Sequence, residues 1–282
     1  MNEEIVIIQA NRSWFRFPWK EILHYRDLLF LLVRRDFVAK YKQTVLGPLW
    51  FIIQPLMTTV VFTVVFGKIA GIPTDQLPPM LFYLCGMLPW GYFAKCLNGT
   101  AGTFVNNAHL FGKVYFPRLI VPLSVVISSL IMFTIQLGTF LVFWIYFKWF
   151  TTAGNIIQPS WMIFVLPLFL LQSAALGLGV GLWMTALSAK YRDFSYLGDF
   201  LTQLWLYATP VVYPLSSVPE KWRWVSAANP MSVIVEVFRY AFLGAGTVDG
   251  EYIVISVCMT LIMLISGLLI FNKVERTFID TV

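Results

Sequence analysis

Long apolar stretches without charge alternate with short segments that hold the charged residues. The uncharged stretches cover residues 43–67, 119–147, 149–189, 200–219 and 252–272. Each of them can cross roughly 30 Å of hydrocarbon as a helix. The pattern predicts an all-α membrane protein with six transmembrane helices, at residues 47–68, 80–104, 118–147, 160–188, 196–213 and 252–271.

The segment ahead of the first span mixes apolar and charged side chains. Within residues 19–36, six leucines and isoleucines are interspersed with charged residues such as Lys20, Glu21 and Arg26. This predicts an amphipathic interfacial helix on the cytoplasmic leaflet. The helix either has a role beyond anchoring or is an ordinary amphipathic anchor. We expect residues 1–18 and 276–282 to be cytoplasmic tails that flank one transmembrane domain, residues 37–275.

Prolines break the segment between the fifth and sixth predicted spans. Pro214, Pro219 and Pro230 fall within the 38 residues 214–251, and because proline lacks a backbone donor they exclude one continuous helix. Helical pieces near 215–228 and 230–244 can enter the outer leaflet and return if protein shields their backbone. We therefore predict a re-entrant helical hairpin over residues 214–245.

Composition and charge support this topology and set its orientation. The chain is 59% hydrophobic and 12% charged, with a mean hydropathy of +0.75, whereas a soluble domain has about a quarter charged residues. With six spans and a cytoplasmic N-terminus, fourteen Lys and Arg residues lie inside and five outside. This asymmetry follows the positive-inside rule and predicts that both termini are cytoplasmic. Because the cations flank apolar spans, we expect no nucleic-acid partner.

Residues for catalysis or metal binding are sparse. His24 and His109 are the only histidines and lack neighbouring ligands, while Cys85, Cys96 and Cys258 lie in apolar stretches. We expect no metal site, no catalytic residue and no bound cofactor. The chain has no G-x-x-x-x-G-K-[ST] motif, so ATP and Mg would bind a separate ATPase chain if ATP drives the protein.

Two features inside the spans allow two interpretations each. Lys95 either faces protein or a water-filled path, or extends to the lipid headgroups. Ala175, Gly177, Gly179 and Gly181 form a small-residue face in the fourth span. This face allows close helix packing, within one subunit or between two copies.

Two cytoplasmic connections combine aromatic residues with cations, NNAHLFGKVYFP at 106–117 and SAKYRDFSY at 188–196. Such segments can seat in a groove of a soluble partner, although each can also be a simple turn. The candidate contact residues are His109, Phe111, Lys113, Tyr115, Tyr191, Arg192, Asp193 and Phe194.

Aromatic residues make up 17% of the chain. Trp and Tyr at headgroup level explain part of this content. Others fall within spans or the proline-broken segment, where they can pack in the core, face lipid, or line a path on which sugar rings stack. The candidates for such a path are Trp50, Tyr83, Trp90, Tyr92, Trp205, Tyr207, Tyr213, Trp222 and Trp224.

Three motifs, in order, resemble a known family. They are RRDFVAKYKQTVLGPLWFIIQP at 34–55, YRD at 191–193, and TPVVYP at 209–214, followed by VP at 218–219 and NPMS at 229–232. The sequence is similar to permease subunits of type-2 ABC transporters that export O-antigen, capsular polysaccharide or teichoic acid. The resemblance implies a homodimer in the bacterial inner membrane, with two separate ATPase subunits below it and the proline-broken segment as an outer gate.

The resulting hypothesis is export of undecaprenyl-linked polysaccharide, with O-antigen as the leading substrate. The pyrophosphate headgroup would be attracted by the cations Arg34, Arg35, Lys40 and Lys42. Two alternatives stay open: a type-2 ABC exporter of a small drug or lipid, and a membrane-embedded glycan-modifying enzyme that uses a carboxylate such as Glu236.

Overall fold

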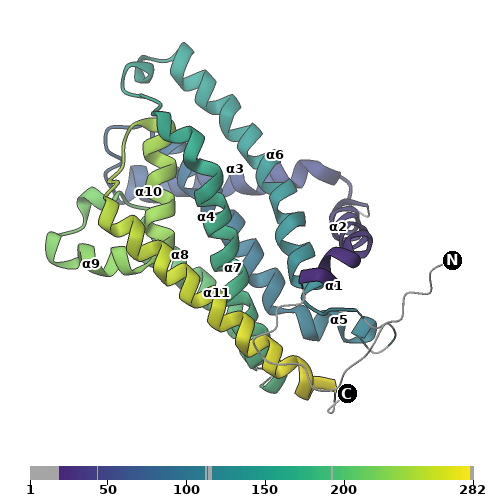
Figure 1. The fold of residues 1–282 in the computed structure, drawn as a ribbon. Coiled ribbons are helices and arrows are strands. Elements are labelled where there is room, and N and C mark those ends of the chain that lie inside the picture. Colours follow the sequence, from purple (N-terminus) through teal and green to yellow (C-terminus); the bar gives the residue numbers. More distant parts are fainter. Residues whose placement is uncertain (1–18, 43, 112, 114–115, 192, 280–282) are drawn as a thin grey trace.

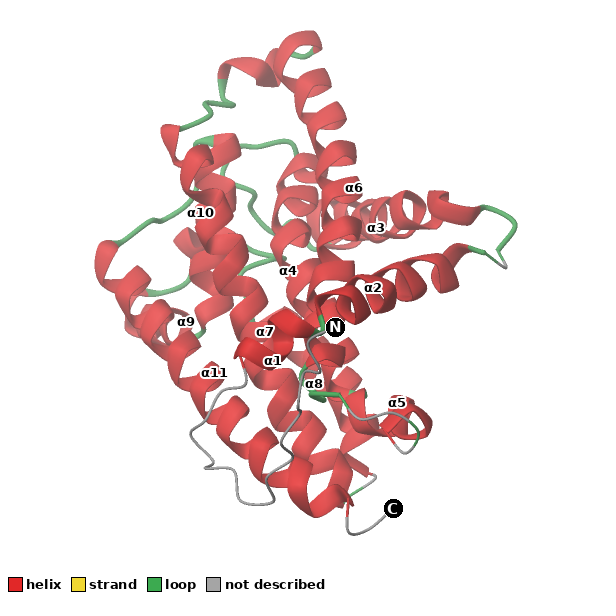
Figure 2. Cartoon of the chain, turned by 45° about the vertical axis from the view of Figure 1, so that its right-hand side comes forward, coloured by secondary structure: helices red, strands yellow, loops and turns green. Residues whose placement is uncertain are grey.

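The computed structural model describes residues 19–279 except 43, 112, 114–115 and 192. Over these residues it is helical, with no strand (Figures 1 and 2). The α-helices are α1 Trp19–His24, α2 Arg26–Tyr41, α3 Trp50–Phe62, α4 Pro79–Ala101, α5 Thr103–Phe111, α6 Ile120–Phe150, α7 Leu166–Lys190, α8 Asp193–Ala208, α9 Glu220–Ala228, α10 Pro230–Leu243 and α11 Gly250–Ile279.

Five helical segments are long and apolar enough to cross a membrane. They are Gly47–Ile69, which contains α3, Pro79–Ala101, Ile120–Phe150, Trp161–Lys190 and Gly250–Glu275. They lie where hydropathy places spans one to four and span six. The sixth expected crossing, residues 196–213, corresponds to α8, which ends at Ala208 after 16 residues. The all-α membrane class is confirmed, whereas the count of six spans is not.

The region expected as one interfacial helix is two helices. The break is at Tyr25, whose φ and ψ of −89° and 22° are not helical. The helix α2 packs along α6, with Leu32 and Val33 buried. It also contacts α3, because the rings of Phe37 and Phe51 stack with their centroids 6.0 Å apart. Figure 2 shows α2 and α3 as a hairpin on one side of the molecule.

The core is centred on α4 and α7. Glycines of α7 permit its close contacts: a Cβ on Gly177 would come within 3.0 Å of the Phe93 carbonyl oxygen of α4, and one on Gly179 within 2.7 Å of the Leu264 Cα of α11. Of the two interpretations of the small-residue face, packing within one subunit is therefore the one observed.

The proline-broken segment contains two helices, α9 and α10, close to the ranges expected for its helical pieces. Asn229 separates them, and its side chain accepts a hydrogen bond from the Met231 backbone N–H as the cap of α10. Every residue of α10 except Tyr240 is buried, and Gly244 ends the helix at φ 75°, a left-handed conformation that glycine adopts without strain. The insertion of this pair into a membrane stays a prediction.

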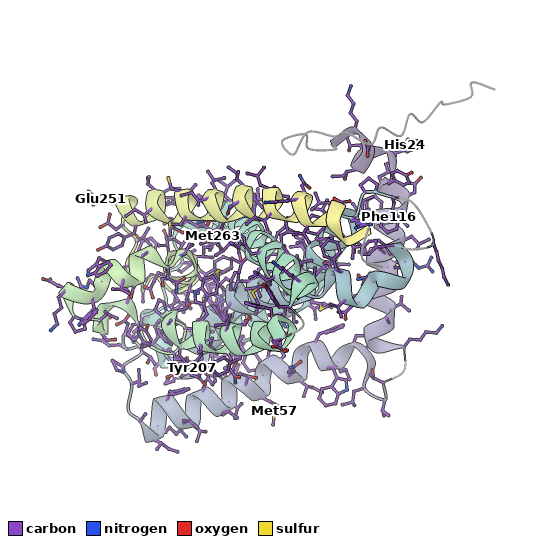
Figure 3. The ribbon with its side chains drawn as sticks, turned by 90° about the horizontal axis from the view of Figure 1, so that it is seen from below. His24, Met57, Phe116, Tyr207, Glu251 and Met263 are labelled. Carbon is purple, nitrogen blue, oxygen red and sulfur yellow. The ribbon has the colours of Figure 1, made fainter. Side chains whose placement is uncertain are left out.

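The helix α3 is the spanning element least covered by the rest of the chain. Only 11% of its most apolar window is buried, compared with 72% for α4. Met57 of α3 points away from the molecule in Figure 3, while Met263 of α11 lies on the other side. In a membrane, the exposed face of α3 must contact lipid or another protein chain.

Candidate functional site

A cavity of about 820 Å³ lies between α3, α4 and α6, with residues of α2 and α5 at one end. Along α6 its lining extends from Val121 to Thr139. The 18 steps from residue 121 to residue 139 correspond to about 27 Å of helix at 1.5 Å per residue. The cavity therefore extends along most of the thickness of a hydrocarbon core, which is about 30 Å.

Charged and amide side chains gather at the end of the cavity near α2 and α5. Arg35 and Asp36 of α2 form an ion pair with Nη2 and Oδ1 at 2.8 Å, and the Ser124 hydroxyl of α6 donates to Asp36 Oδ2 at 3.5 Å. Lys95 of α4 lines the same cavity. Lys95 thus faces the interior, as the first of its two interpretations states. The amides at this end are Asn98, Asn106 and Asn107.

The far part of the cavity keeps polar side chains on α6. Ser128, Gln136 and Thr139 all line it, and Gln136 is only 8% exposed. The Gln136 Oε1 lies over Gly91 of α4, where a Cβ would be 3.6 Å from it. A Cβ at position 91 would thus be in ordinary van der Waals contact with the amide, which lies directly between the two helices.

The polar face of α6 was missed by sequence reasoning, although a signal for it exists. Ser124, Ser128 and Gln136 recur at multiples of four residues in an otherwise apolar span, a spacing that places side chains on one helix face. In a transmembrane helix, such a stripe indicates a face that does not contact lipid.

The nine candidate path aromatics do not form one surface. Tyr83, Trp90 and Tyr92 of α4 are 0%, 4% and 3% exposed, and among these nine only Trp90 lines the cavity. Exposed positions are held by Trp50, Tyr207, Trp222 and Trp224, while Trp205 and Tyr213 are half-buried. The Trp205 Nε1 donates to Asn229 Oδ1 at 2.9 Å, so this ring also positions the start of α10.

Four cations were expected near the membrane entry. Arg34, Arg35 and Lys42 are exposed, whereas the side chain of Lys40 lies outside the described residues. Of the three cations whose side chains the structure describes, Arg35 is the one that also lines the cavity. A role of these cations in headgroup binding stays a prediction.

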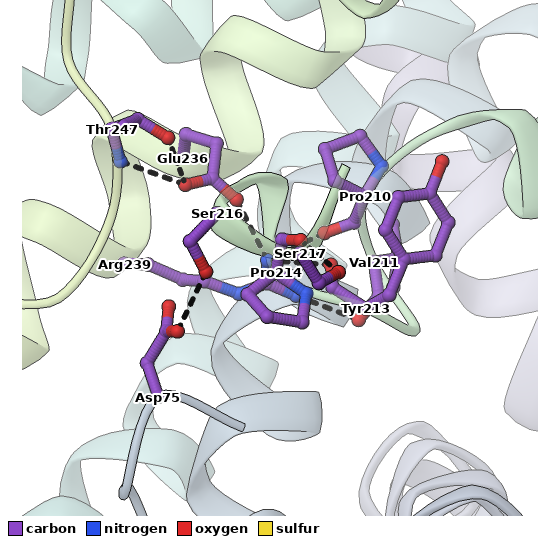
Figure 4. A network of polar contacts seen from close by, with 10 residues as sticks. All are labelled: Asp75, Pro210, Val211, Tyr213, Pro214, Ser216, Ser217, Glu236, Arg239 and Thr247. Atoms are coloured by element: carbon purple, nitrogen blue, oxygen red, sulfur yellow. Dashed lines mark hydrogen bonds and ion pairs between the residues drawn. The ribbon is translucent and has the colours of Figure 1, made fainter. Parts of the chain in front are cut away.

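A second polar site joins α10 to the turn after α8 (Figure 4). Arg239 and Glu236 are each 1% exposed and pair at 2.9 Å. Arg239 also donates through Nη1 to the Pro210 carbonyl at 2.5 Å and through Nη2 to the Val211 carbonyl at 2.6 Å, while its guanidinium lies 3.7 Å from the ring centroid of Phe82. The pair therefore holds the TPVVYP turn onto α10 and α4.

Both carboxylate oxygens of Glu236 are occupied. Oε1 accepts from Arg239, and Oε2 accepts from the Thr247 backbone N–H at 2.9 Å. A general base must reach a proton on the substrate. Since Glu236 is buried and both of its oxygens accept hydrogen bonds within the protein, its geometry fits a structural role.

The candidate contact residues of the two cytoplasmic connections differ in exposure. Tyr191, Asp193 and Lys113 are exposed, with the Lys190 Nζ 5.3 Å from the Tyr191 ring centroid. Phe111 and Phe194 are half-buried. Phe111 packs 6.0 Å from Phe104 and 5.7 Å from Phe116, centroid to centroid. Tyr115, Arg192 and the side chain of His109 lie outside the described residues.

Residues 27–243 match the membrane family described as "ABC-2 type transporter". The chain belongs to this family. The ABC-2 membership and the five apolar helices confirm the predicted localisation, a multi-pass protein of the bacterial inner membrane.

Similar proteins cover nearly the whole of this ABC-2 permease. It is 28% identical over 255 residues to the O-antigen export system permease protein RfbA of Klebsiella pneumoniae, covering 90% of this chain and 94% of that protein. It is 27% identical over 266 residues to the RfbA protein of Myxococcus xanthus, with 93% and 98% covered. The polysialic acid transport protein KpsM of Escherichia coli is 22% identical over 262 residues, with 90% and 95% covered.

Proposed function

We propose that this chain is the membrane-spanning subunit of an ATP-driven exporter of lipid-linked polysaccharide, with an O-antigen as its polymer. The similarity to O-antigen export permeases over nine-tenths of both chains is the observation that carries this proposal. Identity is higher with the two O-antigen permeases, at 28% and 27%, than with the polysialic acid and capsule proteins, at 22% and 20%. This difference favours O-antigen over capsule.

Two copies of the chain would form the transporter. The little-buried α3 and the exposed side chains of α8, such as Leu204 and Tyr207, provide apolar faces that a second copy can cover. The helix α8 is about 24 Å long at 1.5 Å per residue, shorter than the hydrocarbon core. In this proposal α8 is the sixth crossing, completed on the outer side by α9 and α10.

The energy would come from two separate ATPase subunits that bind ATP and Mg. The exposed Tyr191, Asp193 and Lys113 support docking at the two cytoplasmic connections, since an aromatic ring beside charged groups is typical of an interface anchor. Closure of the ATPases would then move α7 and α8, the two helices that the 188–196 connection joins.

Substrate entry would use the cations at and beyond the C-terminal part of α2. Arg34, Arg35, Lys40 and Lys42 would attract the pyrophosphate of undecaprenyl-linked glycan through charge-assisted hydrogen bonds. The exposed Trp222 and Trp224 of α9 would meet the sugar at the outer side, with α9 as the gate. The occupied carboxylate of Glu236 argues against the enzyme alternative. The other alternative, an exporter of small molecules, is distinguished by the following test.

The test is a deletion strain complemented with the tagged chain. The exporter proposal expects loss of surface polysaccharide on deletion, accumulation of undecaprenyl-linked glycan inside, and an ATPase that co-purifies with the chain from detergent extracts. Deletion of that ATPase should give the same trapped glycan. Normal surface polysaccharide with altered resistance to small molecules or altered lipid distribution would instead favour the small-molecule exporter.

A further inference from the structure

The cavity between α3, α4 and α6 has a composition that changes along its length. Its end near α2 and α5 holds two cations, Arg35 and Lys95, and one carboxylate, Asp36, a formal net charge of +1. Its far part is uncharged but polar, with Gln136 and Thr139 on α6 opposite apolar residues of α3 and α4. A cavity filled by ordinary lipid tails would not need this polar face.

The hydroxyl oxygens that line the cavity can accept hydrogen bonds from a ligand in it. Ser128, Thr58 and Thr139 each donate to a backbone carbonyl three or four residues earlier in their own helix, at 3.1 Å in all three cases. A hydroxyl oxygen keeps acceptor lone pairs when its hydrogen is donated. These side chains are therefore prepared to accept hydrogen bonds from a ligand that is rich in donors, as a sugar is.

The amide of Gln136 adds both a donor and an acceptor to the polar face of the cavity. It is 8% exposed, and across the described part of the chain no side chain or backbone group makes a hydrogen bond with it. Neither of its amide atoms is among the fully buried side-chain atoms without a partner, so the amide opens onto the cavity and is not sealed in the core. Because it points into the cavity, a ligand or water there must supply its hydrogen bonds.

Lys95 lies toward the end of α4 that adjoins α5. It is six residues from the last residue of α4, Ala101, which corresponds to about 9 Å at 1.5 Å per residue. An ammonium group inside a membrane protein marks a substrate or ion pathway more often than a packing position. Phosphate oxygens are ligands that an ammonium group in such a pathway can bind.

We propose that this cavity binds the reducing end of the lipid-linked glycan within a single subunit, with the phosphate at Lys95 and the first sugars along Gln136 and Thr139. This inference rests on the proposed export function and adds a subsite to it. The cavity volume of about 820 Å³ is within the range of roughly 300–1,000 Å³ of small-molecule sites. It therefore suits a phosphate and a short sugar segment, while the remaining polymer lies outside it.

Photo-crosslinking at two threonines of α6 tests the location. Thr139 lines the cavity, whereas Thr134 is exposed on the same helix and makes the same type of hydrogen bond to its own backbone. A photoreactive residue at 139, in the full transporter in nanodiscs, should crosslink to a radiolabelled undecaprenyl-pyrophosphoryl disaccharide, and one at 134 should not. Equal labelling at both positions would overturn the proposal.

Binding to the same probe tests the residues. Lys95→Gln should weaken the affinity at least tenfold, Lys95→Arg should restore most of it, and Lys68→Gln, which removes an exposed lysine outside the cavity, should leave it unchanged. Gln136→Leu should weaken the binding of the disaccharide probe but should not change the binding of undecaprenyl pyrophosphate without sugar. An equal affinity of Lys95→Gln and Lys68→Gln would overturn the inference.

Two further experiments distinguish a phospholipid from the lipid-linked glycan as the source of the phosphate, and the cavity inference from the export proposal. If phosphatidylglycerol competes with the disaccharide probe at equal concentration, the cavity is a phospholipid site and the inference fails, although export can stand. If the wild-type chain binds the probe in the cavity but does not restore surface polysaccharide in the deletion strain, the proposed export function fails instead. Loss of both binding and export in Lys95→Gln, with an unchanged folded yield, is the expected result.

Discussion

The Arg239 Nη1 lies 2.9 Å from the Glu236 Oε1, and both side chains are 1% exposed. This ion pair joins two consecutive turns of α10 to backbone carbonyls of the TPVVYP turn and to Thr247. Removing one member of a buried ion pair leaves an uncompensated charge, which costs about 3–5 kcal/mol. The pair therefore controls the stability of the segment between α8 and α11.

A double-mutant cycle tests this relationship. Arg239→Met and Glu236→Leu should each lower the free energy of unfolding in detergent by about 3 kcal/mol or more. The double variant should be less destabilised than the sum, because neither charge is then left alone. Strict additivity would show that the two side chains contribute independently, through Phe82 and the backbone carbonyls for Arg239 and through Thr247 for Glu236.

Helix packing at α7 gives a second prediction with a matched control. Gly179→Ala places a Cβ 2.7 Å from the Leu264 Cα, whereas a Cβ on Gly138 of α6 meets nothing within 4 Å. Overpacking of this kind costs about 1–3 kcal/mol. We expect Gly179→Ala to lower the thermal denaturation midpoint in detergent and Gly138→Ala to leave it equal or slightly higher. Equal midpoints of Gly179→Ala and the wild-type chain would contradict the close contact of α7 and α11.

Hydropathy predicted five of the spanning helices because each is a long run of apolar residues, and this property needs no tertiary information. The assignment of α8 was harder, since Thr209 and Pro210 lie in an apolar stretch that reads as a continuation of the helix. In the structure the backbone leaves the helix after Ala208, and Arg239, distant in sequence, binds the freed carbonyls. A local pattern cannot show such a partner.

The site was predicted less well than the fold. The aromatic candidates were chosen by residue type, but the rotation of each helix decides whether a ring faces a cavity, as Trp90 does, or the core, as Tyr83 does. The polar stripe of α6 carried a period of four that could have been read from the sequence. The pairing of Arg35 with Asp36 could also be predicted locally, because the two residues are adjacent in the sequence. The position of Lys95 opposite α6 could not, because it depends on how α4 packs.

The cations of α2 provide a third prediction, which tests the entry proposal. Arg34→Ala should trap lipid-linked glycan in the cytoplasmic leaflet and reduce surface polysaccharide, because an exposed guanidinium near the membrane attracts a phosphate headgroup. Arg26→Ala removes an exposed arginine from the first turn of the same helix and should leave export unchanged. Silver-stained surface polysaccharide and extracted glycolipid are the measurements, and equal export by both variants would remove Arg34 from the proposal.

The fourth prediction separates docking from folding at the cytoplasmic connections. Tyr191 is 52% exposed and makes its ring contacts only within its own connection in the described structure, with Lys190 and Phe194. Phe111 instead packs in a cluster with Phe104, Phe116 and Arg118. Tyr191→Ala should therefore reduce the co-purified ATPase at least tenfold at normal folded yield, as loss of an interface anchor worth about 2 kcal/mol would. Phe111→Ala should lower the folded yield in detergent, and the fraction that folds should still bind the ATPase.

If Tyr191→Ala retains the ATPase fully, docking does not depend on this connection, and the loop containing Lys113 becomes the surface to test.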